Sequence, residues 1–396
     1  MKICGIICEY NPLHNGHVYL LNETKKRSGC DAVVCVMSGE FTQRGEMAVL
    51  EKYTRAKHAV LAGADAVIEL PVPFACAPAE LFAKGAVKLL SSLPDLCVLA
   101  FGSEDGDKQA ILNAAQKTAE EESGFRASLK KYLKEGLSLT KARTQALSDA
   151  GEEAAAQTIA SPNNILAVEY CKALSTFGCS ADILPVRRIG AGYADETLLK
   201  NLSSASAIRK AVSENKWRAV RKNVPDFVFE DLKNAVSPAG FQKLALCAAL
   251  KMPPEQMKKL TDCTEGLENR IKAFAKNTPD YDELIGKVTT KRYISSRIRR
   301  ILAACLLELE DDLVKRALRA PLYLKVLAVN KQRADEILPV LRTSAFPLLT
   351  RRSDLSLLGK AAAEVYAKDE LASDLFHLAS DLPCRESQMR LIDPRI

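Results

Sequence analysis

The stretch KICGIICEYNPLHNGHVYLL, residues 2–21, predicts how this chain begins to fold. Its apolar run, residues 3–8, ends at an Asn-Pro turn, which is typical of a buried parallel strand. Apolar residues then recur with helical spacing. His14 and His17 are therefore expected at a helix N-terminus, at the carboxyl edge of the first strand. Open α/β sheets bind ligands at this edge, and the backbone N–H groups and dipole of a helix start favour phosphate.

The alternation of strand and helix continues beyond this stretch. Buried strands are predicted at 32–37, 66–70, 97–101 and 181–186, and helices at 48–62, 77–93 and 165–177. Strands and helices that alternate through short loops predict an α/β fold with a Rossmann-like, doubly wound parallel sheet. Residues 108–157 are helical in spacing and highly charged, so we interpret them as a helical insertion over the sheet edge.

Polar loops follow several of these strands. The loop SGEFTQRGE, residues 38–46, follows the second strand, and Gly102 begins the turn after the fourth. An amide pair at 163–164 starts a helix, and an arginine pair at 187–188 ends the fifth strand. Because the carboxyl ends of parallel strands meet at one edge, we expect these groups to face the same crevice as the histidines.

The composition is that of a globular chain of 396 residues, long enough for two domains or three. The 12 cysteines are scattered without a C-x-x-C pair, so we expect reduced core residues rather than disulfides or a zinc site. No apolar stretch reaches the roughly 18 residues that a membrane span needs, and the first twenty residues lack the features of a signal peptide. We therefore expect a cytoplasmic protein without a membrane partner.

After the sheet the chain changes character. Residues 213–396 are predicted to be mostly helical, with a small α/β tail that holds strands at 323–329 and 346–349. The segment KVTTKRYISSRIRR, residues 287–300, carries six positive charges and no negative one, with Tyr293 among them. Dense positive charge beside an aromatic ring is typical of an RNA-backbone contact, and a solvated helix face explains the same pattern. The residues predicted to bind RNA are Lys291, Arg292, Arg297, Arg299 and Arg300.

The spacing H-x-G-H at 14–17 resembles the signature of the nucleotidylyl transferase superfamily, Rossmann-like enzymes that cleave ATP between its α- and β-phosphates. The resemblance implies that His14 and His17 are catalytic and contact the phosphates. It extends over residues 1–210 and includes SSASAIR at 203–209, similar to a serine-rich turn that closes on the β- and γ-phosphates. That role is implied for Ser204, Ser206 and Arg209; an ordinary serine N-cap with a solvated arginine is the alternative.

A narrower resemblance covers the whole chain. The motifs GIICEYNPLHNGH, SGEFTQRGE, FGSE, SPNNILAVEY, RRIGAGY and SASAIR look like those of bacterial tRNA(Met) cytidine acetate ligases. That family joins ATP and acetate into acetyl-adenylate and transfers the acetyl group to the wobble cytidine of elongator tRNA(Met), giving N4-acetylcytidine. The resemblance implies a catalytic domain at 1–212, a tRNA-binding region at 213–396, elongator tRNA(Met) and acetate as partners, and Mg²⁺ on the phosphates. No protein ligand for that metal and no protein partner is evident.

The resemblance also assigns the contacts to ATP, although it does not settle which member of each pair at 163–164 and 187–188 makes the contact. The implied residues are Ile7, Cys8, Glu9, Tyr10, Asn11, Pro12, Leu13, His14, Asn15, Gly16, His17, Val18, Tyr19, Leu20, Gly102, Asn163, Asn164, Arg187 and Arg188.

Two other readings stay open at this point. An adenylyltransferase that passes AMP to a small phosphorylated acceptor would share the fold. An RNA-binding protein whose Rossmann unit no longer catalyses would share the basic helices, although intact His14, Gly16 and His17 argue against it. Exchange of pyrophosphate into ATP, with acetate as the only co-substrate, separates the three readings.

Overall fold

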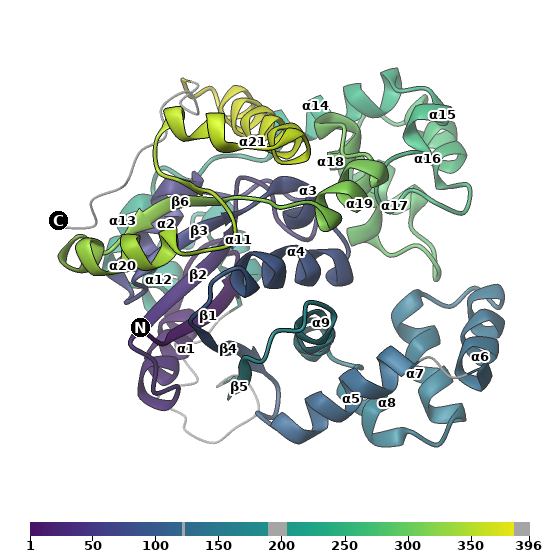
Figure 1. Ribbon diagram of the computed structural model, residues 1–396. Coiled ribbons are helices and arrows are strands. Elements are labelled where there is room, and N and C mark those ends of the chain that lie inside the picture. The colour runs from purple at the N-terminus through teal and green to yellow at the C-terminus, as the bar shows by residue number, and fades with distance from the viewer. Residues whose placement is uncertain (121–122, 189–203, 384–396) are drawn as a thin grey trace.

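A central sheet organises the part of the chain that the computed structural model describes, residues 1–120, 123–188 and 204–383 (Figure 1). Its seven strands lie in the order β5-β4-β1-β2-β3-β6-β7. Their bounds are β1 Ile3–Cys8, β2 Ala32–Ser38, β3 Ala66–Leu70, β4 Leu96–Ser103, β5 Asp182–Arg187, β6 Leu324–Val329 and β7 Leu348–Leu349. The motif RRIGAGY begins at the end of β5, and its residues from 189 on lie outside the described residues.

The first five strands are parallel, which confirms the predicted Rossmann-like sheet. The strand β1 lies at its centre, paired with β2 on one side and with β4 on the other. The strands β3 and β5 extend the sheet outward, again in parallel. All five carboxyl ends therefore meet at one edge, where the turns after β1 and β4 and the end of β5 come together.

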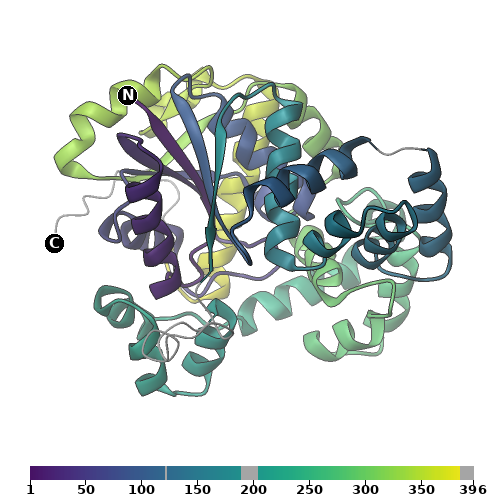
Figure 2. The same ribbon diagram turned by 90° about the horizontal axis from the view of Figure 1, so that it is seen from below.

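Helices cover both faces of this sheet (Figure 2). One face packs against α4, Ala79–Ser91, and α9, Pro162–Thr176, through a core that includes Phe82, Leu89 and Tyr170. The other face packs against helices whose buried residues include Leu21, Tyr53, Ile208, Val220 and Phe229. These helices are α1 Asn15–Arg27, α2 Lys52–Leu61, α11 Ala205–Ser213, α12 Trp217–Asn223 and α13 Asp226–Leu232, while the short α3, Val72–Ala75, precedes α4.

The predicted insertion is helical, as expected. It consists of α5 Lys108–Glu120, α6 Ser123–Lys134, α7 Leu139–Asp149 and α8 Glu153–Thr158. The helix α5 packs against α9, so the insertion extends the helical layer beside the sheet rather than the sheet itself (Figure 1).

A second hydrophobic core lies within the helical region that follows. It is built around buried residues such as Phe241, Ile271 and Leu302, and it reaches the loop after β2 through Phe41 and Met47. The helices of this region are α14 Ala239–Lys251, α15 Pro254–Met257, α16 Leu267–Ala275, α17 Tyr281–Val288, α18 Ser295–Leu307 and α19 Asp311–Arg319.

The last part of the chain returns to the sheet. The predicted strand near 323–329 is confirmed as β6, which pairs antiparallel to β3 and carries β7 at its outer side. The chain continues through η1 Lys331–Arg333, α20 Ala334–Arg342, η2 Arg352–Leu357 and α21 Lys360–Ala379. The helix α21 contributes Tyr366 to the core of the sheet and Phe376 to the core of the helical region, so it joins the two.

Two further observations concern the described residues as a whole. None of their helices is both long and apolar enough to cross a membrane. Their cysteines are free thiols, and most of them are buried.

Candidate active site

The two histidines of the H-x-G-H motif form the first turn of α1. His14 is the N-cap residue, and its Nδ1 accepts a hydrogen bond from the Gly16 N–H at 3.1 Å. The His17 Nδ1 accepts one from the His14 N–H at 3.3 Å, so the pair forms a capping box that uses imidazoles. Their rings stack with centroids 3.7 Å apart, and Tyr10 packs edge-on against His17. This geometry fixes both rings at the carboxyl edge of β1.

The local electrostatics keep both imidazoles neutral in the free protein. Burial lowers the pKa of His14 to about 4, with a further contribution from the positive charge of Arg188. Burial, His14 and Arg188 lower the pKa of His17 as well. Because each Nδ1 accepts a backbone N–H, the hydrogen bonds assign the proton of each neutral ring to Nε2. Two ring N–H donors are thus available, and an arriving anion raises the pKa of both rings toward the cationic form.

The ends of β4 and β5 bring the second part of the site to this turn. Arg188 Nη1 donates to Asn163 Oδ1 at 2.6 Å, and the Arg188 backbone N–H donates to Ser103 O at 2.9 Å. A Cβ at Gly102 would lie 3.4 Å from Arg188 Cγ, an ordinary contact distance, so the Arg188 side chain runs beside the end of β4. The positive charge of Arg188 contributes to the lowered pKa of both imidazoles, so its guanidinium lies near them.

The two members of each pair, at 163–164 and at 187–188, make different contacts. Asn164 is 3 % exposed, and its Oδ1 accepts the Glu104 N–H at 3.2 Å, so it fixes the turn after β4. Asn163 bonds Arg188 through its Oδ1 and Glu104 Oε1 through its Nδ2. The Arg187 backbone and Cβ lie against Gly106 instead. Asn163 and Arg188 are therefore the members that share a hydrogen bond beside the histidines.

Most side chains of the segment 7–20 serve the fold. Ile7, Tyr10 and Leu13 are buried in the cores on either face of the sheet. Asn11 Oδ1 accepts the Val49 N–H at 2.9 Å. Glu9 Oε1 accepts the Gln43 N–H at 2.7 Å, which ties the end of β1 to the loop at 38–46. The imidazoles of His14 and His17 are therefore the part of this segment that offers N–H donors to a ligand.

The serine-rich turn begins α11. Ser204 Oγ accepts the Ala207 N–H at 3.2 Å, which is the ordinary N-cap. Arg209 donates to Asn11 O at 2.9 Å and to Glu46 Oε2 at 2.9 Å, and its Nη2 lies 3.4 Å from Ser206 Oγ. Arg209 thus holds α11 against the turn between β1 and α1. The contact of this motif with phosphates stays a prediction.

The loop at 38–46 is held in place by a buried arginine of α2, Arg55, which the sequence motifs did not identify as functional. Arg55 donates to the carbonyl oxygens of Glu9 at 2.7 Å, Ser38 at 3.0 Å, Leu50 at 2.9 Å and Gly39. Burial raises the pKa of the neighbouring Glu40 to about 7 even though Lys52 and Arg55 oppose that shift. The available signal was the three-residue spacing of Lys52, Arg55 and His58, which lie on one face of α2 and are all buried.

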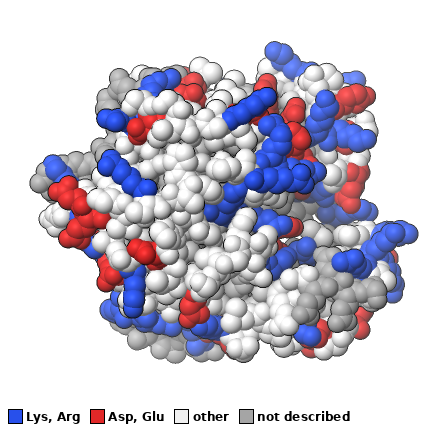
Figure 3. Space-filling view, viewed as in Figure 1, with Lys and Arg blue, Asp and Glu red and all other residues white. Residues whose placement is uncertain are grey.

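The basic cluster of the helical region is paired with acids from other segments. Arg297 and Arg300 reach Asp262 at 3.3 and 2.6 Å, and Arg292 pairs with Glu265. Arg299 lies 3.8 Å from both Glu46 and Asp282. The sequence has no acid within the cluster, but folding supplies them, because charge balance depends on residues distant along the chain. Figure 3 shows Lys and Arg interspersed with Asp and Glu where the insertion and the helical region meet.

Two members of the cluster have further structural contacts. Arg300 is 7 % exposed and donates to Gln43 O at 3.3 Å, and its backbone lies against Gly45, whose φ of +71° suits a residue without a side chain. Arg292 donates to Leu133 O at 2.9 Å, which joins the helical region to the insertion. Lys291 is exposed and has no ion pair with a described residue.

The described side chains of the site form no metal-binding cluster. Among the described residues no three His, Cys, Asp or Glu side chains are grouped so that they could hold a metal ion. Glu104 and Asp105 follow β4, but Glu104 bonds Asn163. An Mg²⁺ ion here would be held mostly by phosphate oxygens and water, as this ion commonly is.

The depressed pKa of His14 predicts a pH-dependent stability. Above pH 6.5 the ring is neutral in both states, but below it only the unfolded state takes up the proton, until the pH approaches 4. His14 should therefore lower the free energy of unfolding by about 3 kcal/mol between pH 7 and pH 4. Urea unfolding of the wild type and of His14→Asn, which keeps an N-cap acceptor without titrating, measures this term. Parallel pH curves for the two proteins would show that His14 titrates normally.

The sequence of this chain is similar to those of a known enzyme family. A sequence model described as HIGH Nucleotidyl Transferase matches residues 1–390. The tRNA(Met) cytidine acetate ligase of Acetivibrio thermocellus is 39% identical over 370 residues, covering 89% of each chain. The enzyme of the same name from a Thermoanaerobacter species is 37% identical over 387 residues and covers 96% of each chain.

Solved structures agree with the sequence relatives. The crystal structure of Thermotoga maritima TmcAL bound with alpha-thio ATP superposes with a TM-score of 0.90 and 28% identity, covering 99% of this chain and 100% of that chain. The apo form of the same protein gives the same TM-score at 29% identity. The chain therefore belongs to the HIGH nucleotidyl transferase family, in the branch formed by the tRNA(Met) cytidine acetate ligases.

Proposed function

We propose that this chain is an ATP-dependent ligase that activates acetate as acetyl-adenylate and acetylates the wobble cytidine of elongator tRNA(Met) to N4-acetylcytidine. The observation that carries the proposal is the stacked pair of neutral imidazoles at the start of α1, which faces Arg188. Relatives named for this activity match this chain over almost its whole length, and a structural relative is bound to an ATP analogue.

In the first step a carboxylate oxygen of acetate attacks the α-phosphorus of ATP. A bond forms between that oxygen and phosphorus, the bond to the bridging oxygen of the β-phosphate breaks, and pyrophosphate leaves with the electron pair. Negative charge builds on the phosphoryl oxygens, and donors fixed in advance stabilise it. His14 and His17 supply Nε2–H groups, Arg188 supplies a permanent charge, and the N-terminal end of the α1 dipole favours the anion. Alignment of the reactants replaces a side-chain nucleophile.

In the second step the exocyclic amine of cytidine attacks the acetyl carbonyl of acetyl-adenylate. A carbon–nitrogen bond forms, the bond between the acetyl carbon and the phosphate oxygen breaks, AMP leaves, and the amine nitrogen loses a proton. The cytidine must leave its stack to reach the adenylate. We propose that Lys291, with the outward parts of Arg292 and Arg299, contacts the tRNA backbone, while Arg297 and Arg300 keep the shape of that surface through Asp262.

Within this proposal Asn163 and Arg188 contact ATP, and Mg²⁺ accompanies the triphosphate. Asn163 and Arg188 already share a hydrogen bond of 2.6 Å beside the histidines. Ser204, Ser206 and Arg209 close on the β- and γ-phosphates only if Arg209 exchanges its contact with Glu46 for the ligand.

The test of the function is pyrophosphate exchange into ATP by the whole chain, with acetate and without tRNA. Exchange that needs acetate supports the ligase. Exchange that needs a phosphorylated acceptor instead would support the adenylyltransferase, and exchange under neither condition would leave an RNA-binding protein. Acetylation of a tRNA(Met) transcript, read by mass spectrometry of its nucleosides, completes the assignment.

The arginine pair offers an internal comparison. Arg188→Ala should raise the KM for ATP in the exchange assay about 10- to 100-fold, since it removes a charged donor to phosphate. Arg187→Ala, which removes an equal charge one residue away, should change the KM less than about threefold, because the Arg187 Cβ lies against Gly106 and Arg187 does not contribute to the lowered pKa of either histidine. Initial rates at varied ATP concentration measure both values. A larger effect at Arg187 would show that the other member of the pair faces the nucleotide.

A further inference from the structure

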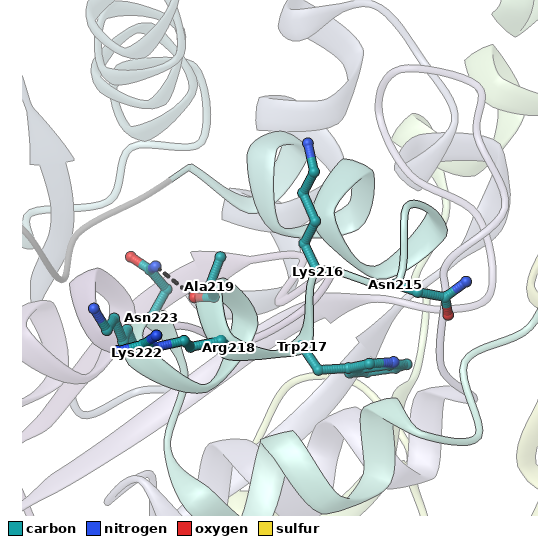
Figure 4. A pocket seen from close by; sticks show the side chains of 7 residues that line it. All are labelled: Asn215, Lys216, Trp217, Arg218, Ala219, Lys222 and Asn223. Atoms are coloured by element: carbon teal, nitrogen blue, oxygen red, sulfur yellow. Dashed lines mark hydrogen bonds between the residues drawn. The ribbon is translucent and has the colours of Figure 1, made fainter.

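Residues of α12 line an open pocket of about 590 Å³ that the proposed chemistry does not use (Figure 4). Its lining residues are Asn215, Lys216, Trp217, Arg218, Ala219, Lys222 and Asn223. The pocket adjoins the catalytic turn, because Asn15 Nδ2, from between the two histidines, donates to Lys222 O at 3.1 Å. Val220 on the same helix is fully buried in the core beneath the sheet, which fixes α12 in place. Whatever occupies this pocket therefore lies next to the start of α1.

The lining is cationic. Lys216, Arg218 and Lys222 contribute positive charges, and no carboxylate is among the lining residues that the structure describes. Lys216 pairs with Glu214 at 2.7 Å, whereas Arg218 and Lys222 have no ion pair within the described part of the chain. Arg218 and Lys222 are four residues apart and lie on the same face of the helix, as Figure 4 shows. Two charges that the fold does not neutralise favour an anionic ligand.

An aromatic ring accompanies these charges. Trp217 is the single tryptophan of the sequence and is half-buried. It packs perpendicular to Phe229 with ring centroids 6.1 Å apart, so its orientation is set by the fold, and Figure 4 shows it extending away from Arg218. The lining of one pocket therefore combines an indole of fixed orientation with two cations that have no ion pair among the described residues. This combination suits a ligand that has both a flat base and phosphates, as unstacked RNA does.

We propose that this pocket binds an unstacked nucleotide of the tRNA substrate, with Trp217 stacked on its base and Arg218 and Lys222 on its flanking phosphates. The proposal rests on the proposed function. A nucleotide in this pocket would be a neighbour of the target cytidine and would be held out of the base stack of the tRNA. It would lie directly beside the turn that carries His14 and His17. A volume of about 590 Å³ lies within the range of small-ligand sites, about 300–1,000 Å³, and accommodates one nucleotide.

The single tryptophan makes the wild-type chain its own reporter, since emission excited at 295 nm comes from Trp217 alone. Titration with a transcript of elongator tRNA(Met) should quench this emission with the same midpoint as filter binding of the same RNA. Titrations with ATP and with poly-glutamate should leave it unchanged. Filter binding without quenching would overturn the proposal. Quenching by ATP would assign the pocket to the small nucleotide, and equal quenching by poly-glutamate would show a general polyanion surface; either result overturns it too.

Variants separate stacking from charge. Trp217→Ala should weaken tRNA binding about 10-fold or more, and Trp217→Phe should restore most of it, because a phenyl ring still stacks on a base. Arg218→Ala with Lys222→Ala should weaken binding and lower the slope of log Kd against log salt by about 1 to 2. The matched control, Arg342→Ala with Lys360→Ala, removes two exposed charges from α20 and α21 and should change neither quantity. Equal affinity for Trp217→Ala and Trp217→Phe would overturn the stacking role.

Failure of this inference is distinguishable from failure of the proposed function. If the wild type shows acetate-dependent exchange and binds tRNA without a change in Trp217 emission, the function stands and the pocket assignment falls. If neither exchange nor tRNA binding is found, both fall. Loss of fold in Trp217→Ala is recognised by its melting curve, and the fluorescence of the wild-type chain then decides.

Discussion

Replacing His17 with alanine is expected to lower acetate-dependent pyrophosphate exchange by about 10²–10³-fold, the effect of removing one fixed donor from a site where charge develops. The ring is held by the His14 N–H at its Nδ1 and by Tyr10 at its edge, so its Nε2–H is oriented before the substrate arrives. The loss should fall mainly on kcat, because the negative charge that this donor meets grows as pyrophosphate leaves. Exchange rates at saturating ATP and acetate measure it.

A second substitution separates this role from helix capping. His17→Glu keeps an acceptor at the third position of the helix, where a glutamate completes a capping box, and its charge suits a helix N-terminus. The stability of this variant should therefore stay near that of the wild type, whereas His17→Ala should lose about 1 kcal/mol. Exchange should be lost in both, and more completely in His17→Glu, since a carboxylate repels the triphosphate. If exchange instead followed stability, retained with glutamate and lost with alanine, His17 would be a cap and no more.

The sequence could predict this turn because the determinants are local. The apolar run, the Asn-Pro turn and the H-x-G-H spacing lie within twenty residues, and the structure confirms β1 and α1 around them. The same holds for the first five strands and for the helices between residues 108 and 158. Periodicity indicates the elements themselves, and the alternation of strand and helix indicates that the five strands are parallel. What periodicity could not predict was the partner of β6. A strand buried on both faces reads the same in either direction, so only the fold shows that it runs antiparallel beside β3.

Charge was harder to interpret than apolar pattern, for a related reason. The segment 287–300 looks unbalanced along the chain, but Asp262, Glu265 and Glu46 approach it in space. Conversely, the sequence of α12 does not stand out as basic, but two of its three cations, Arg218 and Lys222, have no acid beside them among the described residues, whereas Arg221 pairs with Asp226. The net charge of a surface depends on tertiary contacts, so a basic run predicts an interface only after its neighbours are known.

Arg55 should have the largest effect on stability. Arg55→Met, which keeps the length and removes the guanidinium, is expected to lower the free energy of unfolding by about 3–5 kcal/mol, the cost of breaking a buried charged network from one side. Four carbonyl oxygens, those of Glu9, Ser38, Gly39 and Leu50, would lose their donor where water cannot replace it. Glu40 would lose a cation 3.8 Å away, which drives its already raised pKa further up. Urea unfolding at pH 7 measures the change.

The control for Arg55 lies on the same helix. Lys57→Met removes a partly exposed charge from α2 and should change stability by less than about 0.5 kcal/mol. Arg55→Lys should recover only part of the loss, because an ammonium has three donors at one point, whereas the guanidinium reaches the ends of two strands and the start of α2 at once. These contacts join Glu9, at the end of β1, to the loop at 38–46, so the variant should also show weaker exchange at temperatures where it is still folded. Full stability in Arg55→Met would mean that water or a rearranged loop satisfies the carbonyls, and the loop would then owe its position to its contacts with α18 through Gly45 and Arg300.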